Sequence, residues 1–291
     1  MNDEARVLAP ARVIERREVA RDTVVMRYEL NLRAQVRPGQ FAMVHPGDDD
    51  VYVLPRPLSI LDYRDGVLDL LIKVAGRGSA QLAAMQPGAS VRIFAPLGKP
   101  FDLEEFRGRP AILVAGGVGV VPLHMLSREL RATGSSPLPI FGARAPQDLP
   151  LEILGEEPAG PWQLFVEQQA GEVQRGGPRE GPREGLREGL VTVGLVEALD
   201  RHPDAIVATC GPTPMMHAVA RICRERAVPL RVCLEEQMGC GAGVCRACVV
   251  DDVDGGTRHT VCREGPVFDV EKICFLPEDR PKVATAQGCA S

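Results

Sequence analysis

The 291-residue chain is poor in aromatic residues, which make up 4% of it, and it contains one tryptophan. It has no basic excess, since 34 lysines and arginines are outnumbered by 39 aspartates and glutamates, and the sequence pI is about 5.7. This balance provides no basic field for nucleic acid or anionic lipid. The chain also lacks the roughly 18 uninterrupted apolar residues that cross a bilayer, and it opens with Asn2, Asp3 and Glu4 instead of a secretory leader. We therefore expect a cytoplasmic protein that binds neither membrane nor nucleic acid.

Composition and length indicate a globular protein of about two domains, because apolar residues make up 45% and charged residues 25%. The chain contains nine cysteines. A reducing cytosol does not keep a disulfide framework oxidised, so metal ligation or redox chemistry is the leading explanation for them.

The first part of the chain, residues 1–104, has the pattern of an antiparallel barrel. Short β-branched and apolar runs, such as Thr23–Tyr28 and Val91–Phe94, are separated by the turn pairs Pro38-Gly39, Asp65-Gly66 and Pro87-Gly88. We expect a barrel domain here.

Residues 105–228 have the alternating pattern of a doubly wound parallel sheet. The apolar run Ala111–Ala115 precedes a glycine turn and a helix to about Ala132, and a second helix is expected over 214–226. Within this part, a four-residue repeat without an apolar face predicts a mobile insert at 171–190.

Residues 229–291 are cysteine-rich and have little helical pattern. We expect a small module that is stabilised by something other than hydrophobic burial.

The strongest motif is Cys240-Gly-Ala-Gly-Val-Cys245-Arg-Ala-Cys248, which is followed by Cys262. The spacing C-x4-C-x2-C…C is typical of a plant-type [2Fe–2S] cluster, in which four thiolates hold two irons. The glycines allow the backbone to turn around the cluster with N–H groups toward its sulfurs. A structural zinc site and four unconnected cysteines remain as alternatives.

A second motif, Arg56-Pro57-Leu58-Ser59, is followed by Leu71-Ile72-Lys73 and Gly78-Ser79. Its forked guanidinium, ammonium and backbone donors suit a pyrophosphate, and a serine hydroxyl can reach a flavin ring. Taken alone, the motif favours a structural turn over a flavin site.

A third motif is formed by Ala115-Gly116-Gly117-Val118-Gly119 and by Thr209-Cys210-Gly211-Pro212, which each follow a predicted strand and precede a helix. Ligands bind at such strand ends in open α/β sheets, and the helix N-termini suit phosphates. Two ordinary strand-to-helix turns are the alternative.

In chain order these motifs resemble the ferredoxin reductase superfamily, which binds FAD in its barrel and NAD(P) in a second domain. Together with Leu234-Glu235 and Val261-Cys262-Arg-Glu-Gly-Pro-Val-Phe268, the cysteine motif looks like that of the electron-transfer subunits of NAD-linked, two-subunit dihydroorotate dehydrogenases. The resemblance covers nearly the whole chain. It implies a FAD domain at 1–104, a NAD domain at 105–228 and an iron–sulfur module at 229–291.

The resemblance also implies site residues. It assigns FAD to Arg56, Pro57, Leu58, Ser59, Leu71, Ile72, Lys73, Gly78 and Ser79. It assigns NAD to Gly116, Gly117, Gly119 and Gly211, with Cys210 as a catalytic residue that faces the flavin. It assigns the [2Fe–2S] cluster to Cys240, Cys245, Cys248 and Cys262.

The implied partner is an FMN-containing dihydroorotate dehydrogenase catalytic subunit, in a heterotetramer of two catalytic and two electron-transfer subunits that serves pyrimidine biosynthesis. Single electrons would pass from it through the cluster to FAD, and a hydride would pass to NAD⁺. Two other hypotheses remain: a subunit of an NAD(P)H–ferredoxin oxidoreductase or hydrogenase diaphorase, and a redox-sensing or structural protein that keeps the fold without catalysis. Arg144 is compatible with NADP or with solvent, so the preference between NAD and NADP stays open.

The remaining cysteines, Cys223, Cys233, Cys274 and Cys289, belong to no recognised spacing, and we expect them to have no chemistry. Glu235 and Glu236 either flank the nicotinamide or are solvated at a strand end.

Overall fold

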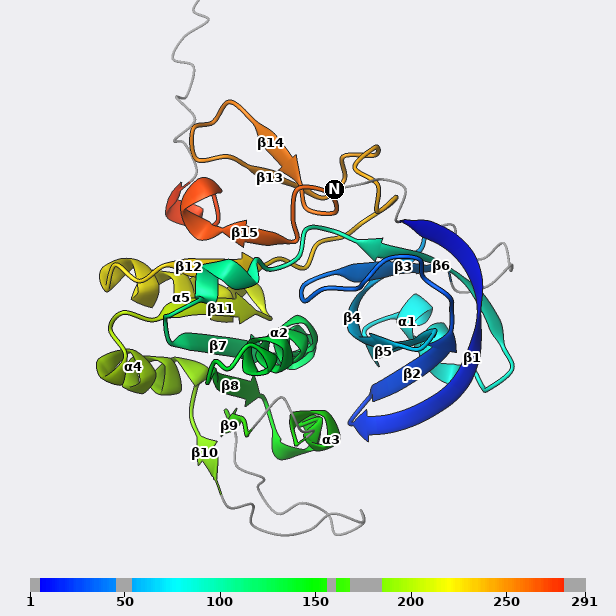
Figure 1. Cartoon of the computed structure of the whole chain (residues 1–291), viewed down its shortest axis with the longest axis horizontal. Helices are drawn as coiled ribbons and strands as arrows, with labels where there is room; N and C mark the ends of the chain where they lie inside the picture. Colours follow the sequence, from blue (N-terminus) through cyan, green and yellow to red (C-terminus); the bar gives the residue numbers. More distant parts are fainter. Residues whose placement is uncertain (1–5, 46–53, 156–160, 168–184, 280–291) are drawn as a thin grey trace, which may run out of the picture.

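A computed structural model describes residues 6–45, 54–155, 161–167 and 185–279 and contains a barrel, an α/β sheet and a cysteine-rich segment (Figure 1). Six antiparallel strands close the barrel in the order β1-β2-β5-β4-β3-β6, which confirms the predicted barrel. The strands are β1 (Val7–Ala20), β2 (Thr23–Glu29), β3 (Phe41–His45), β4 (Arg56–Arg64), β5 (Val67–Lys73) and β6 (Ser90–Leu97).

Local sequence explains how the barrel strands turn and close. Asp65 and Gly66 both have positive φ, at 50° and 78°, and they join β4 to β5 as the predicted two-residue turn. Alternate side chains of the strands fill the interior, where Tyr28 and Leu70 are fully buried. Helix α1 (Arg77–Ala84) adds Leu82 to this interior.

The α/β part is a seven-stranded sheet in the order β10-β9-β8-β7-β11-β12-β15, parallel except for β15. Its strands are β7 (Ala111–Gly116), β8 (Leu138–Ala143), β9 (Gln163–Val166), β10 (Leu186–Glu188), β11 (Ile206–Cys210), β12 (Leu230–Cys233) and β15 (Val267–Asp269). Its helices are α2 (Val120–Ala132), α3 (Leu151–Leu154), α4 (Val191–Arg201) and α5 (Thr213–Glu225).

Helices cover both faces of this sheet. Residues of α2 and α3 belong to one apolar cluster, whereas residues of α4 and α5 belong to another on the opposite face. The predicted doubly wound fold is therefore confirmed. Among the residues described, no helix is both long and apolar enough to cross a membrane.

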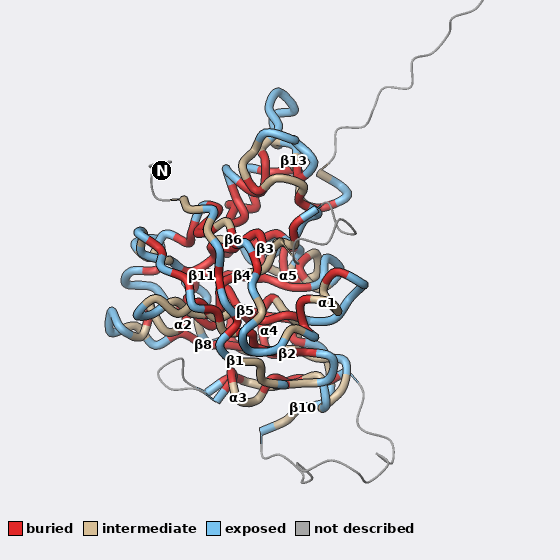
Figure 2. The backbone as a smooth tube through the Cα atoms, turned by 90° about the vertical axis from the view of Figure 1, so that its right-hand side faces the viewer, coloured by how far each residue is buried: buried red, intermediate tan, exposed pale blue. Residues whose placement is uncertain are grey.

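The cysteine-rich segment is built into the sheet. Strand β12 pairs with β11 and strand β15 pairs with β12, so the predicted boundary between residues 228 and 229 falls in front of two strands of the same sheet. Val261, Phe268 and Leu276 are buried in the apolar cluster that also contains α4 and α5. The expectation of a module without hydrophobic burial is therefore wrong, because the segment shares the core of its neighbour. The hairpin of β13 (Val249–Asp251) and β14 (Arg258–Thr260) projects outward from the sheet (Figures 1 and 2).

The predicted insert at 171–190 ends earlier than expected. Strand β10 lies within it and pairs with β9, while residues 171–184 fall outside the described residues. The third repeat unit has Leu186 where the first two have proline, so it retains the N–H that a strand ladder needs. Arg187 also stacks on the Phe165 ring at 4.8 Å and binds Glu197.

Ion pairs join the barrel to the α/β part. Arg21 donates two hydrogen bonds to the Asp148 carboxylate at 3.0 and 2.8 Å, and Arg17 lies 3.2 Å from Glu152. On α2, Met125 packs into the barrel interior. These contacts join the barrel and the α/β part across one interface.

Candidate functional site

A cavity of about 680 Å³ lies where the barrel, the α/β sheet and the cysteine-rich segment meet. The barrel side contributes Phe41, Arg56, Pro57, Leu58, Ser59, Leu71, Lys73, Ala75, Gly76, Arg77, Gly78 and Ser79. The α/β part contributes Val118 and Val121, and the later segments contribute Cys233, Leu234, Glu235, Glu236, Gln237, Met238 and Pro266. Eight of the nine residues predicted to hold FAD therefore line one cavity.

Positive charge and backbone donors gather on the barrel side of this cavity. Arg56, Lys73 and Arg77 line it, as does the N-terminus of α1 at Gly76. A Cβ at Gly78 would overlap the Arg56 guanidinium, so a glycine is required for the guanidinium to lie over this turn. Such an arrangement fits the pyrophosphate of a dinucleotide such as FAD.

Two predicted FAD residues have structural roles that the sequence did not indicate. Ile72 is fully buried in the barrel interior and does not line the cavity, because neighbouring residues of a strand point to opposite faces. The Ser79 hydroxyl accepts hydrogen bonds from the N–H groups of Ala75 and Gly76 at 2.9 and 3.1 Å, so it stabilises the turn before α1.

The predicted nicotinamide residues come together at the carboxyl ends of β7 and β11. A Cβ at Gly119 would overlap the Cys210 carbonyl, and a Cβ at Gly211 would lie 2.8 Å from the Gly116 oxygen. Gly117 has a φ of 56° and opens the turn into α2. The turns that follow β7 and β11 can therefore approach each other this closely because Gly119 and Gly211 lack side chains. The neighbouring Val118 reaches the cavity.

Cys210 is fully buried behind the cavity wall. Its Sγ donates a hydrogen bond to Glu235 Oε1 at 3.8 Å. The hydrogen bond with Cys233, together with burial and the nearby Glu235, raises the pKa of the Cys210 thiol well above its usual value. The Glu235 side chain is exposed and lines the cavity, and desolvation of its carboxyl group by the surrounding protein raises the pKa of that group. Glu235 and Glu236 both line the cavity and both are exposed, which is compatible with either hypothesis for them.

The four predicted cluster cysteines lie together in one loop system. The Cys240 sulfur accepts hydrogen bonds from the Ala242 and Cys245 N–H groups at 3.3 and 3.5 Å, and the Cys262 sulfur accepts one from Gly243 at 3.1 Å. Burial alone would raise the Cys240 pKa, yet these N–H groups lower it to about 7. Burial and the adjacent Cys248 thiol raise the Cys262 pKa to about 12.

This donor set fits a [2Fe–2S] cluster, which takes two thiolates at each iron and accepts N–H hydrogen bonds at its sulfurs. Gly241 and Gly243 have φ values of 69° and 81°, which allow the loop to direct these N–H groups inward. Within the described ranges, no three ligands converge on one metal ion. A mononuclear zinc site would need four ligands on one ion, whereas a binuclear cluster does not.

The cysteine loop packs directly on the barrel. A Cβ at Gly241 would lie 2.5 Å from Met43 Cγ on β3 and 2.9 Å from Leu97 Cδ1 on β6. Met238, two residues before the first cluster cysteine, lines the flavin-sized cavity. The cluster loop and the cavity are therefore neighbours.

Several cavity residues were not predicted. Val118, Val121, Cys233, Met238 and Pro266 line the cavity although the motifs did not assign them to a site. Val118 lies between the predicted Gly117 and Gly119, and Val121 follows two residues later, so the glycine motif was a usable signal for both valines. The sequence contained no signal for Cys233, because its position beside Cys210 depends on strand pairing. Cys274 donates to backbone oxygens of Asp252 and Asp279 and so has a structural contact, and Cys289 lies outside the described residues.

Two known protein domains match the parts of the chain that contain the FAD motif and the cluster cysteines. The oxidoreductase FAD-binding domain matches residues 10–101, and the iron–sulfur cluster binding domain of dihydroorotate dehydrogenase B matches residues 235–274. Fold, site and these two domains together define a flavin- and iron–sulfur-dependent oxidoreductase.

Curated relatives narrow this class. The chain is 34% identical over 276 residues to the dihydroorotate dehydrogenase B (NAD⁺) electron transfer subunit of Shouchella clausii, covering 90% of this chain and 96% of that one. It is 33% identical to a probable counterpart in Methanopyrus kandleri, covering 91% of each, and 33% identical to the Bacillus caldolyticus subunit. The chain belongs to the family of dihydroorotate dehydrogenase B (NAD⁺) electron transfer subunits.

Solved structures agree in fold. NADH-dependent reduced ferredoxin-NADP oxidoreductase superimposes with a TM-score of 0.76 at 24% identity, covering 92% of this chain and 90% of that one. The ferredoxin reductase of carbazole 1,9a-dioxygenase gives 0.64 at 22% identity, with 78% and 69% covered. At these identities the likeness concerns the fold alone.

Proposed function

We propose that this chain carries electrons from an FMN-containing catalytic subunit, which oxidises dihydroorotate, through a [2Fe–2S] cluster and FAD to NAD⁺ in pyrimidine biosynthesis. The observation that carries the proposal is the single cavity lined by the FAD motif, by the turn into α2 and by the segment that leads to the cluster cysteines. When bound, a [2Fe–2S] cluster transfers single electrons, FAD exchanges one or two, and NAD exchanges a hydride, so FAD must connect the other two.

The chain's own residues would bind and orient these groups. Arg56, Lys73 and the start of α1 would hold the FAD pyrophosphate. The glycine junction between β7 and β11 would admit the nicotinamide nucleotide, with Cys210 behind the wall and Glu235 facing the cavity. Cys240, Cys245, Cys248 and Cys262 would ligate the cluster.

The partner is proposed from the names of the relatives, which denote one subunit of a larger enzyme. A separate FMN-containing subunit would supply the electrons, in a heterotetramer of two catalytic and two electron-transfer subunits. No feature of the described residues favours the alternative of a diaphorase or NAD(P)H–ferredoxin oxidoreductase subunit.

Copurification with the FMN-type subunit from the same organism tests the proposal. We expect about one FAD and two irons per electron-transfer chain. Under anaerobic conditions, dihydroorotate should reduce the cluster and FAD of the complex, and NAD⁺ should reoxidise them with formation of NADH. A complex in which reduced ferredoxin, but not dihydroorotate, reduces FAD would overturn this assignment in favour of the alternative.

A further inference from the structure

The cysteine loop rests on the outside of the barrel through Gly241. Gly241 is buried, and a Cβ there would lie 2.5 Å from Met43 Cγ on β3 and 2.9 Å from Leu97 Cδ1 on β6. Both side chains are fully buried in the apolar cluster that also contains Cys248 and Cys262. Protein interiors are close-packed, so these side chains have little room to withdraw. The loop can approach the barrel this closely because position 241 has no side chain.

One face of β3 carries both this contact and a wall of the cavity. Phe41 and Met43 are two residues apart in the strand, so their side chains point to the same side. Both belong to the apolar cluster that includes the cysteine-rich segment, whereas Ala42 belongs to the barrel interior. Phe41 lines the cavity. Two residues of a strand span about 7 Å, so the seat of the cysteine loop lies that far along β3 from a cavity residue.

The chain on both sides of the loop leads to the same cavity. Met238 lines the cavity and precedes Cys240 by two residues, so their Cα atoms are no more than about 7 Å apart. Pro266 also lines the cavity and follows Cys262 by four residues. The depth at which the loop sits on β3 therefore sets the spacing between the cluster ligands and the cavity.

We propose that Gly241 is a positioning residue for electron transfer between the [2Fe–2S] cluster and FAD: because it lacks a side chain, the cysteine loop sits directly on Met43 and holds the cluster close to the flavin. The proposal rests on the proposed function, in which one electron at a time leaves the cluster and enters FAD. The rate of such a transfer falls exponentially with the distance between the two groups. Gly241 acts on this distance through the packing of the loop on β3.

An added methyl group at position 241 should lift the loop. Carbon atoms that are not bonded are most stable at about 3.5 to 4.0 Å, so a Cβ placed 2.5 Å from Met43 Cγ needs about 1 Å more space. Met43 is enclosed by the core, whereas Val244 in the loop is 82% exposed and Cys245 is also exposed. The loop therefore has room to move outward, and the core beneath it does not.

The test compares Gly241→Ala with Gly255→Ala in the FAD- and iron-loaded complex with the catalytic subunit. The two glycines have nearly the same φ, 69° and 68°, so alanine brings the same backbone strain to both, but a Cβ at Gly255 meets nothing within 4 Å. Crystal structures with the irons located by anomalous scattering give the distance from iron to flavin. Stopped-flow absorbance gives the rate at which the cluster, reduced through dihydroorotate, reduces FAD, and separately the rate at which NADH does.

Gly241→Ala should lengthen the distance from iron to flavin by about 1 Å and slow the reduction of FAD by the cluster several-fold. Iron content, cluster potential and the rate of FAD reduction by NADH should not change, because hydride exchange does not use the cluster. A general loss of structure would lower both rates. Gly255→Ala should behave as wild type. Addition of Met43→Ala to Gly241→Ala should restore distance and rate, since it removes the Cγ that the new methyl group meets.

The outcomes separate the positioning role from a packing effect and from the proposed function. An unchanged distance or an unchanged transfer rate in Gly241→Ala would overturn the role, as would equal effects in Gly255→Ala. If Gly241→Ala does not retain the cluster, the double variant with Met43→Ala decides, because the role requires it to recover the cluster and the transfer. If the wild-type complex passes no electrons from dihydroorotate to FAD, the proposed function fails, while the crystallographic distances still test the role of Gly241.

Discussion

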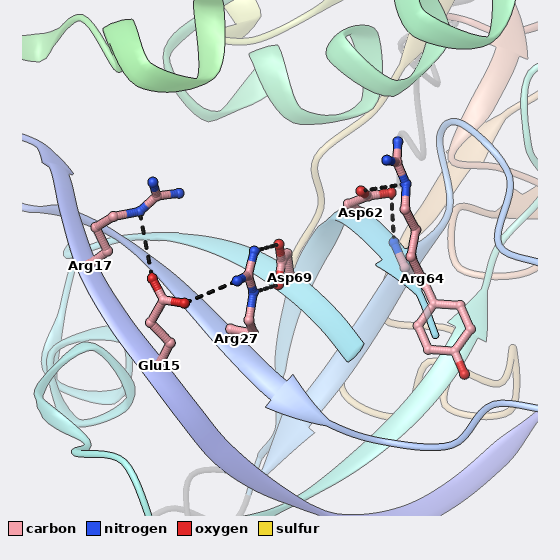
Figure 3. Close-up of polar contacts among 7 residues, drawn as sticks. Glu15, Arg17, Arg27, Asp62, Arg64 and Asp69 are labelled. Carbon is pink, nitrogen blue, oxygen red and sulfur yellow. Dashed lines mark hydrogen bonds and ion pairs between the residues drawn. The ribbon is translucent and has the colours of Figure 1, made fainter. Parts of the chain in front are cut away.

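The Arg128 guanidinium of α2 lies 2.9 Å from the Asp62 carboxylate of the barrel strand β4. The Asp62 carboxylate also forms an ion pair with Arg64, whose Nε lies 3.0 Å from it (Figure 3). A bulge between Ile60 and Asp62 redirects the end of β4, whose beginning carries the FAD motif Arg56-Pro57-Leu58-Ser59. Because the first turn of α2 reaches the cavity through Val121, this ion pair connects the two walls between which nicotinamide and flavin would meet.

Asp62→Asn should therefore slow FAD reduction by NADH and lower the unfolding free energy by about 1 to 2 kcal/mol, as expected for a partly buried pair. Asp69→Asn is the control, since Asp69 binds Arg27 at 2.9 Å within the barrel (Figure 3). Stopped-flow absorbance and thermal unfolding are the measurements. Equal slowing in both variants would contradict a specific role of the Asp62 pair.

Cys245→Ser should remove the cluster and spare FAD. Cys245 is the most exposed of the four predicted ligands, and a serine hydroxyl is a poorer ligand than thiolate for iron. We expect loss of iron, sulfide and dihydroorotate-dependent NADH formation, with unchanged flavin content. Cofactor analysis checks this, with Cys223→Ser as the control. Full physiological turnover without the cluster would disprove the proposed order of carriers.

Cys210→Ser should lower the rate constant of FAD reduction by NADH about ten- to a thousandfold, which corresponds to about 1.4 to 4 kcal/mol of barrier. The shorter C–O bond withdraws the donor from Glu235 Oε1, which already lies 3.8 Å from the sulfur. Stopped-flow reduction measures the rate. Flavin and iron content should not change, and an unaltered rate constant would remove Cys210 from the site.

Gly119→Ala should destabilise the protein by about 1 to 3 kcal/mol through overpacking, because its Cβ would overlap the Cys210 carbonyl. It should also weaken NAD binding, since the turn before α2 would be forced away from the end of β11. The control is Gly256→Ala, where an added Cβ meets nothing within 4 Å. Denaturant unfolding measures the loss of stability, and NAD titration measures the loss of affinity. Unchanged stability and affinity in Gly119→Ala would contradict the prediction.

The Glu278–Arg221 pair should give a pH-dependent stability. Two hydrogen bonds from Arg221, at 2.9 and 3.2 Å, lower the Glu278 pKa from 4.5 to about 2. Because the folded value lies below the unfolded one, the contribution is complete above pH 4.5 and is lost as the pH falls toward 2. The difference in thermal midpoint between wild type and Glu278→Gln should disappear over that range and should shrink in high salt. A difference that persists at pH 2 would contradict the assignment.

The sequence by itself determined the features that depend on neighbours in the chain. Asp65-Gly66 specified a turn with two positive φ values, and Cys240, Cys245 and Cys248 were placed in one loop by their spacing. The FAD motif and the glycine turns were recognisable because backbone conformation and donor chemistry at these points are local properties. These local features were sufficient to predict the family and most of the residues that the barrel contributes to the cavity.

Tertiary structure alone decided which distant residues meet. Leu71 and Lys73 face the cavity, while Ile72 faces the barrel interior. Which of the two faces of β5 points inward is decided by how the strands pair and close into the barrel. Cys233 lies beside Cys210 because β12 pairs with β11 in one register, and no spacing in the sequence records that pairing. Burial of Phe268 likewise depends on β15 joining the sheet. These contacts arise between segments far apart in the chain, so their geometry follows from packing and not from local composition.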